Sequence, residues 1–204
     1  MASIIKSDNG VSSGITGIVQ SADSSGQLVL QTTTSGGTAT TAVTIDNTQK
    51  VTFANAITPS TTNGIVGTTL GDNAVAGSVG EYVSSTVANG TVSFSNGTPL
   101  NVTSISLTAG DWDVWGRLTF GSSSIPSTLN SLSSGVSSVT SSFNEQQARF
   151  YTTAAQLNGY NAEGIPPMTR YNLTTTTTIY LVGNVYFSGG NVNGGGFIGA
   201  RRRR

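Results

Sequence analysis

Residues 111–120, DWDVWGRLTF, alternate between two kinds of side chain. Successive side chains of a β-strand point to opposite faces, so every second residue belongs to the same face. The even-numbered positions are mostly large and apolar, whereas the odd-numbered positions carry charged and polar groups around a tryptophan. The pattern predicts a strand whose core face comprises Trp112, Val114, Leu118 and Phe120. Its outward face then carries Trp115 and Arg117.

Residues 177–187 repeat this two-sided pattern. We assign one side to the core, with Ile179, Leu181 and Phe187, while Tyr180, Val182 and Tyr186 lie on the other. In a charge-poor protein, an aromatic face opposite the core usually marks a partner surface. The alternatives are ordinary exposed aromatics and a ligand platform. We predict a subunit interface made of Trp115, Arg117, Tyr180, Val182 and Tyr186.

The composition excludes several kinds of chemistry. The 204 residues include nine basic and nine acidic residues, and neither cysteine nor histidine. Disulfides, Cys/His zinc sites, thiol nucleophiles and histidine-based catalysis are therefore removed. Four of the nine basic residues are the terminal run 201–204, and the remainder of the chain is mildly acidic. We expect no enzymatic activity, no cofactor and no nucleic-acid partner.

Valine and threonine are abundant, and this β-branched bias favours strands. Residues 1–60 contain only short apolar runs between turn signals. Burial at about 25 cal/mol per Å² hardly offsets an ordering cost of about 1–2 kcal/mol per residue in such a segment. We expect residues 1–60 to fold against copies of themselves or a host surface, the alternative being a flexible tether.

The rest of the chain has longer strands. Residues 61–74, rich in glycine and threonine, follow Pro59 and predict a linker. Residues 75–204 combine clear alternation with frequent turn signals such as Asn89-Gly90, which indicates a sandwich, barrel or jelly roll. Residues 127–150 remain open between strand or loop and helix, because Leu129, Leu132 and Val136 follow a heptad-like spacing among serines and a glycine.

The acidic residues give no site of their own. Asp111 and Asp113 share a strand face and could bind calcium or act as an acid–base pair. The calcium-loop pattern fails at Trp115, so we expect an ordinary surface pair, with Asp113 on the same face as Arg117. We also find no secretory signal and no membrane span, and expect the chain to be made in a host cytoplasm without membrane contact.

Three blocks resemble a known family. They are residues 79–86 (VGEYVSST), residues 101–116 (NVTSISLTAGDWDVWG), and residues 174–181 (TTTTTIYL) together with 196–202 (GFIGARR). In order and spacing they are similar to C-terminal domains of tailed-bacteriophage virion proteins, which occur in tail fibres, head fibres and decoration proteins. The likeness covers about residues 70–204. It implies a trimeric, jelly-roll-like knob carried on an N-terminal anchor, and supplies no catalytic residues.

The combined expectation is an all-β structural protein of a phage particle. Residues 1–60 form a virion-attachment or shaft segment that binds a capsid or tail protein, and residues 75–204 form an antiparallel sandwich that trimerises and projects from the virion. The alternative is a tail-fibre or receptor-binding adhesin that recognises a host surface glycan or protein, with loops such as residues 158–161 (NGYN) stacking on sugars.

Overall fold

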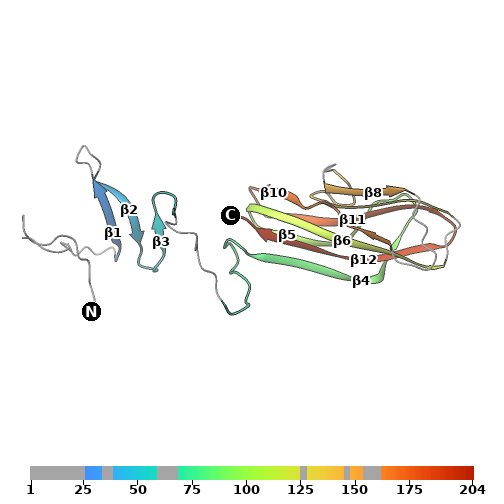
Figure 1. The fold of residues 1–204 in the computed structure, drawn as a ribbon, viewed down its shortest axis with the longest axis horizontal. Coiled ribbons are helices and arrows are strands. Elements are labelled where there is room, and N and C mark those ends of the chain that lie inside the picture. Colours follow the sequence, from blue (N-terminus) through green and yellow to red (C-terminus); the bar gives the residue numbers. More distant parts are fainter. Residues whose placement is uncertain (1–25, 34–38, 59–68, 125–127, 145–147, 154–161) are drawn as a thin grey trace, which may run out of the picture. The chain divides into compact units, whose positions relative to one another are not determined.

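The computed structural model describes residues 26–33, 39–58, 69–124, 128–144, 148–153 and 162–204. The chain divides into two units, Met1–Gly67 and Thr68–Arg204. All sheets of the described residues are antiparallel, as Figure 1 traces, which confirms the all-β prediction. Within these residues, no helix has the length and apolar character that crossing a bilayer requires.

The first unit contains a meander of three short strands. They are β1 (Leu28–Thr33), β2 (Ala39–Ile45) and β3 (Val51–Phe53), paired in that order. Asp46 closes the turn between β2 and β3, because its carboxylate accepts hydrogen bonds from the backbone N–H of Thr48 (2.9 Å) and of Lys50 (3.0 Å). This Asx-type turn sets the register of the second hairpin.

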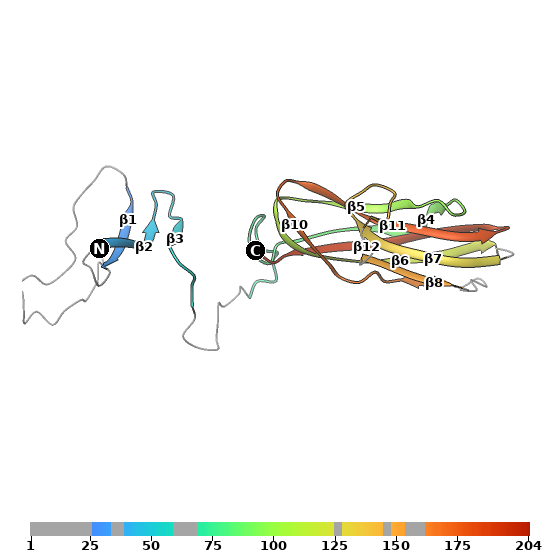
Figure 2. The ribbon, with the colours of Figure 1, turned by 90° about the horizontal axis from the view of Figure 1, so that it is seen from above.

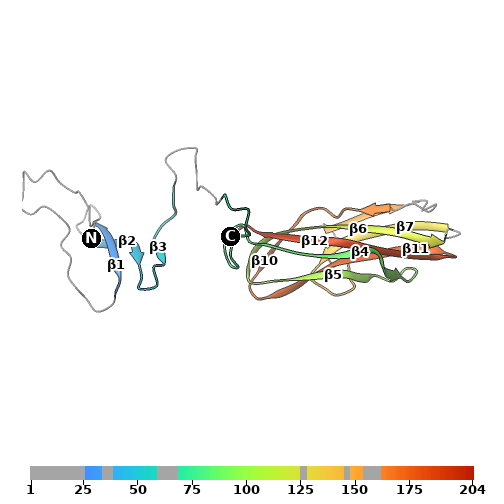
Figure 3. The ribbon, with the colours of Figure 1, turned by 90° about the horizontal axis from the view of Figure 1, so that it is seen from below.

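The second unit is a two-layered sandwich whose strands run along its length in Figure 1, Figure 2 and Figure 3. Its larger sheet has the order β10-β6-β12-β4, with β9 also paired to β6, and its smaller sheet has the order β5-β11-β7-β8. The strands are β4 (Tyr82–Phe94), β5 (Leu100–Leu107), β6 (Gly110–Ser124), β7 (Thr128–Ser137), β8 (Arg149–Thr153), β9 (Ala162–Gly164), β10 (Thr169–Leu173), β11 (Thr177–Ser188) and β12 (Asn191–Arg202). From each strand to the next, the chain passes from one sheet to the other, except that β7 and β8 are neighbours in the smaller sheet and that β9 and β10 both pair with β6 in the larger one. This alternation between the two layers is jelly-roll topology.

The core lies between the two inner faces. Phe94 and Phe120 pack with ring centroids 5.2 Å apart, and Ser85 and Thr103 are hydrogen-bonded across the layers (2.6 Å). Phe187 is half-buried and packs against the core. The fully buried members that the sequence analysis assigned to the core are Trp112, Val114, Leu118, Phe120, Ile179 and Leu181.

Residues 128–137 form β7, a strand rather than a helix. A register shift between Tyr186 and Phe187 of β11 leaves an extra residue on β7, so Leu129 and Leu132 both reach the inner face three positions apart. Val136 follows four positions later, which is two strand repeats. A bulged strand thus produced the heptad-like spacing.

The predicted turn at Asn89-Gly90 is wrong. β4 continues through it, and the register jumps so that Val87 and Val92 pair with residues only two apart on β12. Gly90 adopts a positive φ of 84°, which a glycine allows at no steric cost. The turn-like pair therefore marks a bulge inside a strand.

A buried ion pair closes one end of the sandwich. The guanidinium of Arg202 donates from Nε to Glu81 (2.9 Å) and from Nη1 to the carbonyl of Ala109 (2.8 Å), and lies 4.4 Å above the Trp112 ring. The Arg202 and Glu81 side chains are only 6% and 12% exposed. A Cβ at Gly110 would overlap this guanidinium, and Gly110 has a φ of 144°, so glycine is needed there.

This ion pair joins the three sequence blocks. Glu81 comes from residues 79–86, Ala109, Gly110 and Trp112 from residues 101–116, and Arg202 from residues 196–202. The backbone repeats the connection, because the Arg202 N–H donates to the Glu81 carbonyl (2.9 Å) and the Gly80 N–H donates to the Arg202 carbonyl (3.0 Å). The blocks are distant in sequence and meet in one place.

Glu81→Gln should lower the free energy of unfolding by about 3 kcal/mol, because it leaves the buried Arg202 without its counter-charge. Urea denaturation at one protomer concentration, followed by tryptophan fluorescence, measures this. The matched control is Glu163→Gln, which breaks an ion pair with Arg117 that is exposed within one protomer; measured at a protein concentration low enough to keep the chain monomeric, it should cost less than about 1 kcal/mol. Equal losses in the two variants would contradict the assignment.

Candidate subunit interface

Three aromatic rings gather on the outer face of the larger sheet. Trp115 of β6 lies opposite Gly199 of β12, which in turn lies opposite Ser84 of β4. A Cβ at Gly199 would come within 2.8 Å of the Phe197 ring and 3.2 Å of the Trp115 ring, so both rings lean over this glycine. Tyr82 lies beside Trp115 with ring centroids 6.0 Å apart. We call Tyr82, Trp115 and Phe197 the aromatic cluster.

The alternation of β12 builds its share of this surface. Ile198 and Ala200 point inward and are fully buried, so Phe197, Gly199 and Arg201 point outward. All three rings of the aromatic cluster are half-buried within the chain. Of these three rings only Trp115 was predicted from the sequence, although alternation along the strands beginning at residues 82 and 191 also points Tyr82 and Phe197 outward.

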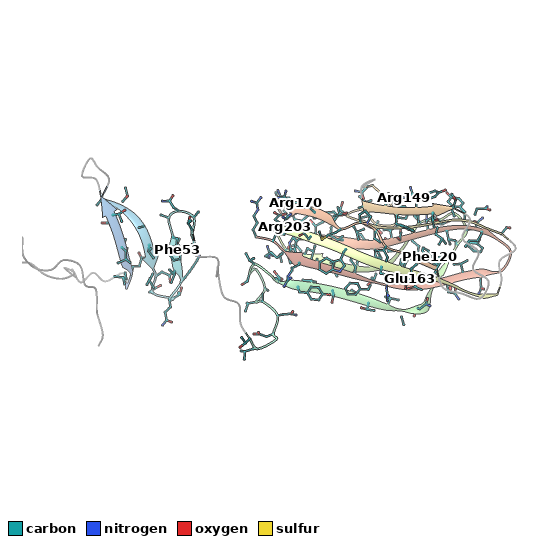
Figure 4. All side chains as sticks on the ribbon, in the orientation of Figure 1. Phe53, Phe120, Arg149, Glu163, Arg170 and Arg203 are labelled. Atoms are coloured by element: carbon teal, nitrogen blue, oxygen red, sulfur yellow. The ribbon has the colours of Figure 1, made fainter. Side chains whose placement is uncertain are left out.

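Ion pairs lie at one end and near the middle of this outer face. At one end, Arg170 of β10 donates two hydrogen bonds to Asp111 of β6, from Nε (2.7 Å) and Nη2 (2.9 Å). Arg203 lies 3.5 Å from Asp113, and Arg204 lies 3.2 Å from Asp111. Figure 4 shows Arg170 and Arg203 together at this end. Near the middle of β6, Arg117 pairs with Glu163 of β9 (3.4 Å).

These contacts give Arg203, Arg204, Asp111 and Asp113 a structural role within the chain. The hydrogen bonds from Arg170 lower the pKa of Asp111 below its usual value, against the opposing effect of burial. The same hydrogen bonds raise the pKa of Arg170. Burial alone would raise the pKa of Glu81, but hydrogen bonds from the Gly77 N–H and from Arg202 outweigh it and lower that pKa. Among the described residues, no three carboxylates lie close enough together to hold a metal ion.

The predicted interface residues do not form one patch. Trp115 and Arg117 lie on the outer face of the larger sheet, whereas Tyr180 and Tyr186 pair with outward-facing serines of β7 on the smaller sheet. The outer faces of a two-layered sandwich point away from each other. One flat contact therefore includes either the tryptophan or the two tyrosines.

Val182 is a clear correction, because it is fully buried within the chain. It lies between Asn101 of β5 and Gly135 of β7 in the smaller sheet. The segment 138–144 folds over this place: Asn101 accepts a hydrogen bond from the Ser141 N–H (2.7 Å), and a Cβ at Gly135 would touch the Phe143 ring. An intrachain cover thus removes Val182 from any interface.

The rest of the smaller sheet's outer face is partly covered within the chain, although Tyr151 and Tyr186 stay 54% and 46% exposed. The Arg149 guanidinium lies 4.7 Å from the Phe143 ring centroid and 5.4 Å from that of Tyr151, and donates to Ser133 (2.8 Å). The Tyr186 ring leans on Gly97 of the turn between β4 and β5. Residues 158–161, expected as a sugar-binding loop, lie outside the described residues.

Comparison with known proteins gives no family assignment. No family model matches the chain, and no curated protein matches it. Among solved structures it shows distant similarity to a chain of the infectious bursal disease virus Gx strain, with a TM-score of 0.41 and 14% identity over 60% of this chain and 32% of that one. The VP2 subviral particle of the same virus gives a TM-score of 0.37 and 16% identity, over 60% of this chain and 33% of that one. The chain thus spans about a third of the length of these structures.

Acid should weaken the sandwich in a defined range. The pKa values of Asp111 and Glu81 are lowered in the folded state, so their stabilising contribution is present above the ordinary carboxyl pKa of about 4 and is lost as the pH falls below it. We expect the urea midpoint to stay flat from about pH 7 to 5 and to fall below about pH 4. Arg170→Gln should make this fall shallower. A midpoint that drops between pH 7 and 5 would contradict the assignment.

Proposed function

We propose that this chain is a non-enzymatic structural protein of a tailed-phage virion. It acts as a homotrimeric capsid decoration or head-fibre protein, whose C-terminal sandwich projects from the particle surface. The outer face of the larger sheet is the subunit contact in the sandwich. The N-terminal unit connects this knob to the virion.

The aromatic cluster is the observation that carries the proposal. Trp115, Tyr82 and Phe197 share one outer sheet face around a glycine that leaves it flat, and each retains exposed surface. Fully burying a large apolar side chain is worth about 1.5–3 kcal/mol, and each of these half-buried rings can contribute a fraction of that when another subunit covers it. Aromatic residues concentrated at the centre of a patch are typical of interface hot spots.

The state of the neighbouring charges also favours a protein contact. The carboxylates of Asp111, Asp113 and Glu163 on this face each have an arginine beside them within the chain. Their paired arrangement lowers the cost of covering the face, because no carboxylate has to find a new counter-charge. Only 9% of the whole chain is charged, which suits a protein surrounded by other subunits.

The trimeric state and the phage particle come from the resemblance of the three sequence blocks. Those blocks supply Glu81, Gly110, Trp112 and Arg202, which close one end of the sandwich. The resemblance therefore includes the residues that form the buried ion pair of this fold and its surroundings. The smaller sheet is the weaker choice for the contact, because Val182 is covered within the chain.

Light scattering of the full chain should give about three times the protomer mass of 20.8 kDa. Trp115→Asp places a charge in the aromatic cluster and should yield monomers. The matched control is Tyr186→Asp, an exposed aromatic on the opposite outer face, which should remain trimeric. Circular dichroism checks that both variants keep their β-structure.

A monomeric wild-type chain would overturn the trimer, and a trimeric Trp115→Asp variant would overturn the assigned contact. Labelling of phage particles with an antibody against the sandwich tests the location. Uniform decoration of the capsid is expected. Label confined to the tail tip, with binding of the isolated protein to host cells, would favour the adhesin alternative instead.

A further inference from the structure

The three-stranded sheet of the N-terminal unit is two-sided. Residues paired across antiparallel strands share a face, and residues two apart on one strand also share a face. Leu30, Val43 and Phe53 pair across β1, β2 and β3. The row two positions along each strand consists of Leu28, Ile45 and Val51. We call these six residues the apolar face.

The apolar face has no cover among the residues that the structure describes. Phe53 is 49% exposed and Val51 48%, and Figure 4 marks Phe53 on β3. Leu28 and Leu30 are 42% and 40% exposed, and none of the described residues 26–58 is buried. On the opposite face, the one row between these two consists of Val29, Thr44 and Thr52. A small sheet needs a covered apolar face to be stable in water.

We propose that the apolar face is a second subunit interface, which packs against the apolar faces of other copies of this chain. The proposal rests on the trimer proposed above and gives the N-terminal unit a part in assembling it. In the trimer the three apolar faces meet around the symmetry axis.

A second copy fits this surface better than a charged partner. Within residues 26–58 the only charged side chains are Asp46, which follows β2, and Lys50, which precedes β3. Their charges are opposite, so the net charge of this segment is zero. The apolar face itself carries no polar side chain, so it offers no electrostatic complementarity to an acidic or basic surface. A copy of the same sheet is present at equal concentration and presents the same flat, uncharged surface.

The size of the face shows what it can do. Three strands about 4.8 Å apart and two side-chain rows about 6.7 Å apart give an area of a few hundred Å² at most. A stable protein contact buries about 800 Å² on each partner. The apolar face is therefore too small to hold copies together alone. The apolar faces of different copies pack together once the contact between the sandwiches has brought the N-terminal units to a high effective concentration.

The natural absence of cysteine provides the test. Val43→Cys and Thr44→Cys each introduce one thiol on the central strand, the first on the apolar face and the second on the opposite face. In the trimeric full chain, the thiol at position 43 should react with a small maleimide at least about tenfold more slowly than the thiol at position 44. Both thiols should react at the same rate in denaturant.

Two further outcomes identify what covers the face. In the monomeric Trp115→Asp background the two thiols should react at similar rates, whereas persistent protection at position 43 would mean that the same chain covers the face, which overturns the proposal. A trimeric chain with equal reactivity at both positions would also overturn it and leave the proposed function intact. A monomeric wild-type chain would instead remove the proposed function, and with it this inference.

Discussion

A strand presents two faces, and a two-layered sandwich can bury only one face of each sheet. In this chain the inner faces make a complete core around residues such as Trp112, Leu118 and Leu181. The outer face of the larger sheet still carries Trp115 between Tyr82 and Phe197. The three-stranded sheet of the N-terminal unit also leaves an apolar face exposed, because no second sheet packs on it among the described residues. Both units therefore have apolar surface that another copy of the chain can cover.

The buried ion pair between Glu81 and Arg202 gives the sandwich its closed end. Arg202 of β12 lies on the inner face, stacks on Trp112 of β6 and donates hydrogen bonds to Glu81, just before β4, and to Ala109, just before β6. These contacts fix β4, β6 and β12 to one another at this end. The following arginines bind acids on the outer face of the same end. Three of the four terminal arginines, Arg202, Arg203 and Arg204, thus connect the last strand and the residues after it to acids elsewhere in the sandwich.

Alternation along β6 and β11 was enough to predict which of their residues are buried on the inner face, because a strand's side-chain period is two. The same alternation could not show that β6 and β11 belong to different sheets, which separates Trp115 from Tyr180. Nor could it show that the segment 138–144 contacts Asn101 and Gly135, which lie on either side of Val182. A bulge made the turn prediction at Asn89-Gly90 wrong, and a second bulge explains why the spacing around Leu129 left strand and helix open. The partnership of Glu81 with Arg202 spans 121 positions, and no local pattern announces it.

The solvent access of Trp115 tests the central claim most directly. The chain has two tryptophans, and Trp112 is fully buried, so quenching by iodide reports on Trp115 alone. If copies of the chain cover the larger sheet, the fluorescence of the assembled protein should resist iodide and become quenchable on dilution into the monomeric range. Emission that iodide quenches equally at high and low protein concentration, with about half of it accessible, would contradict the claim that this face lies between subunits.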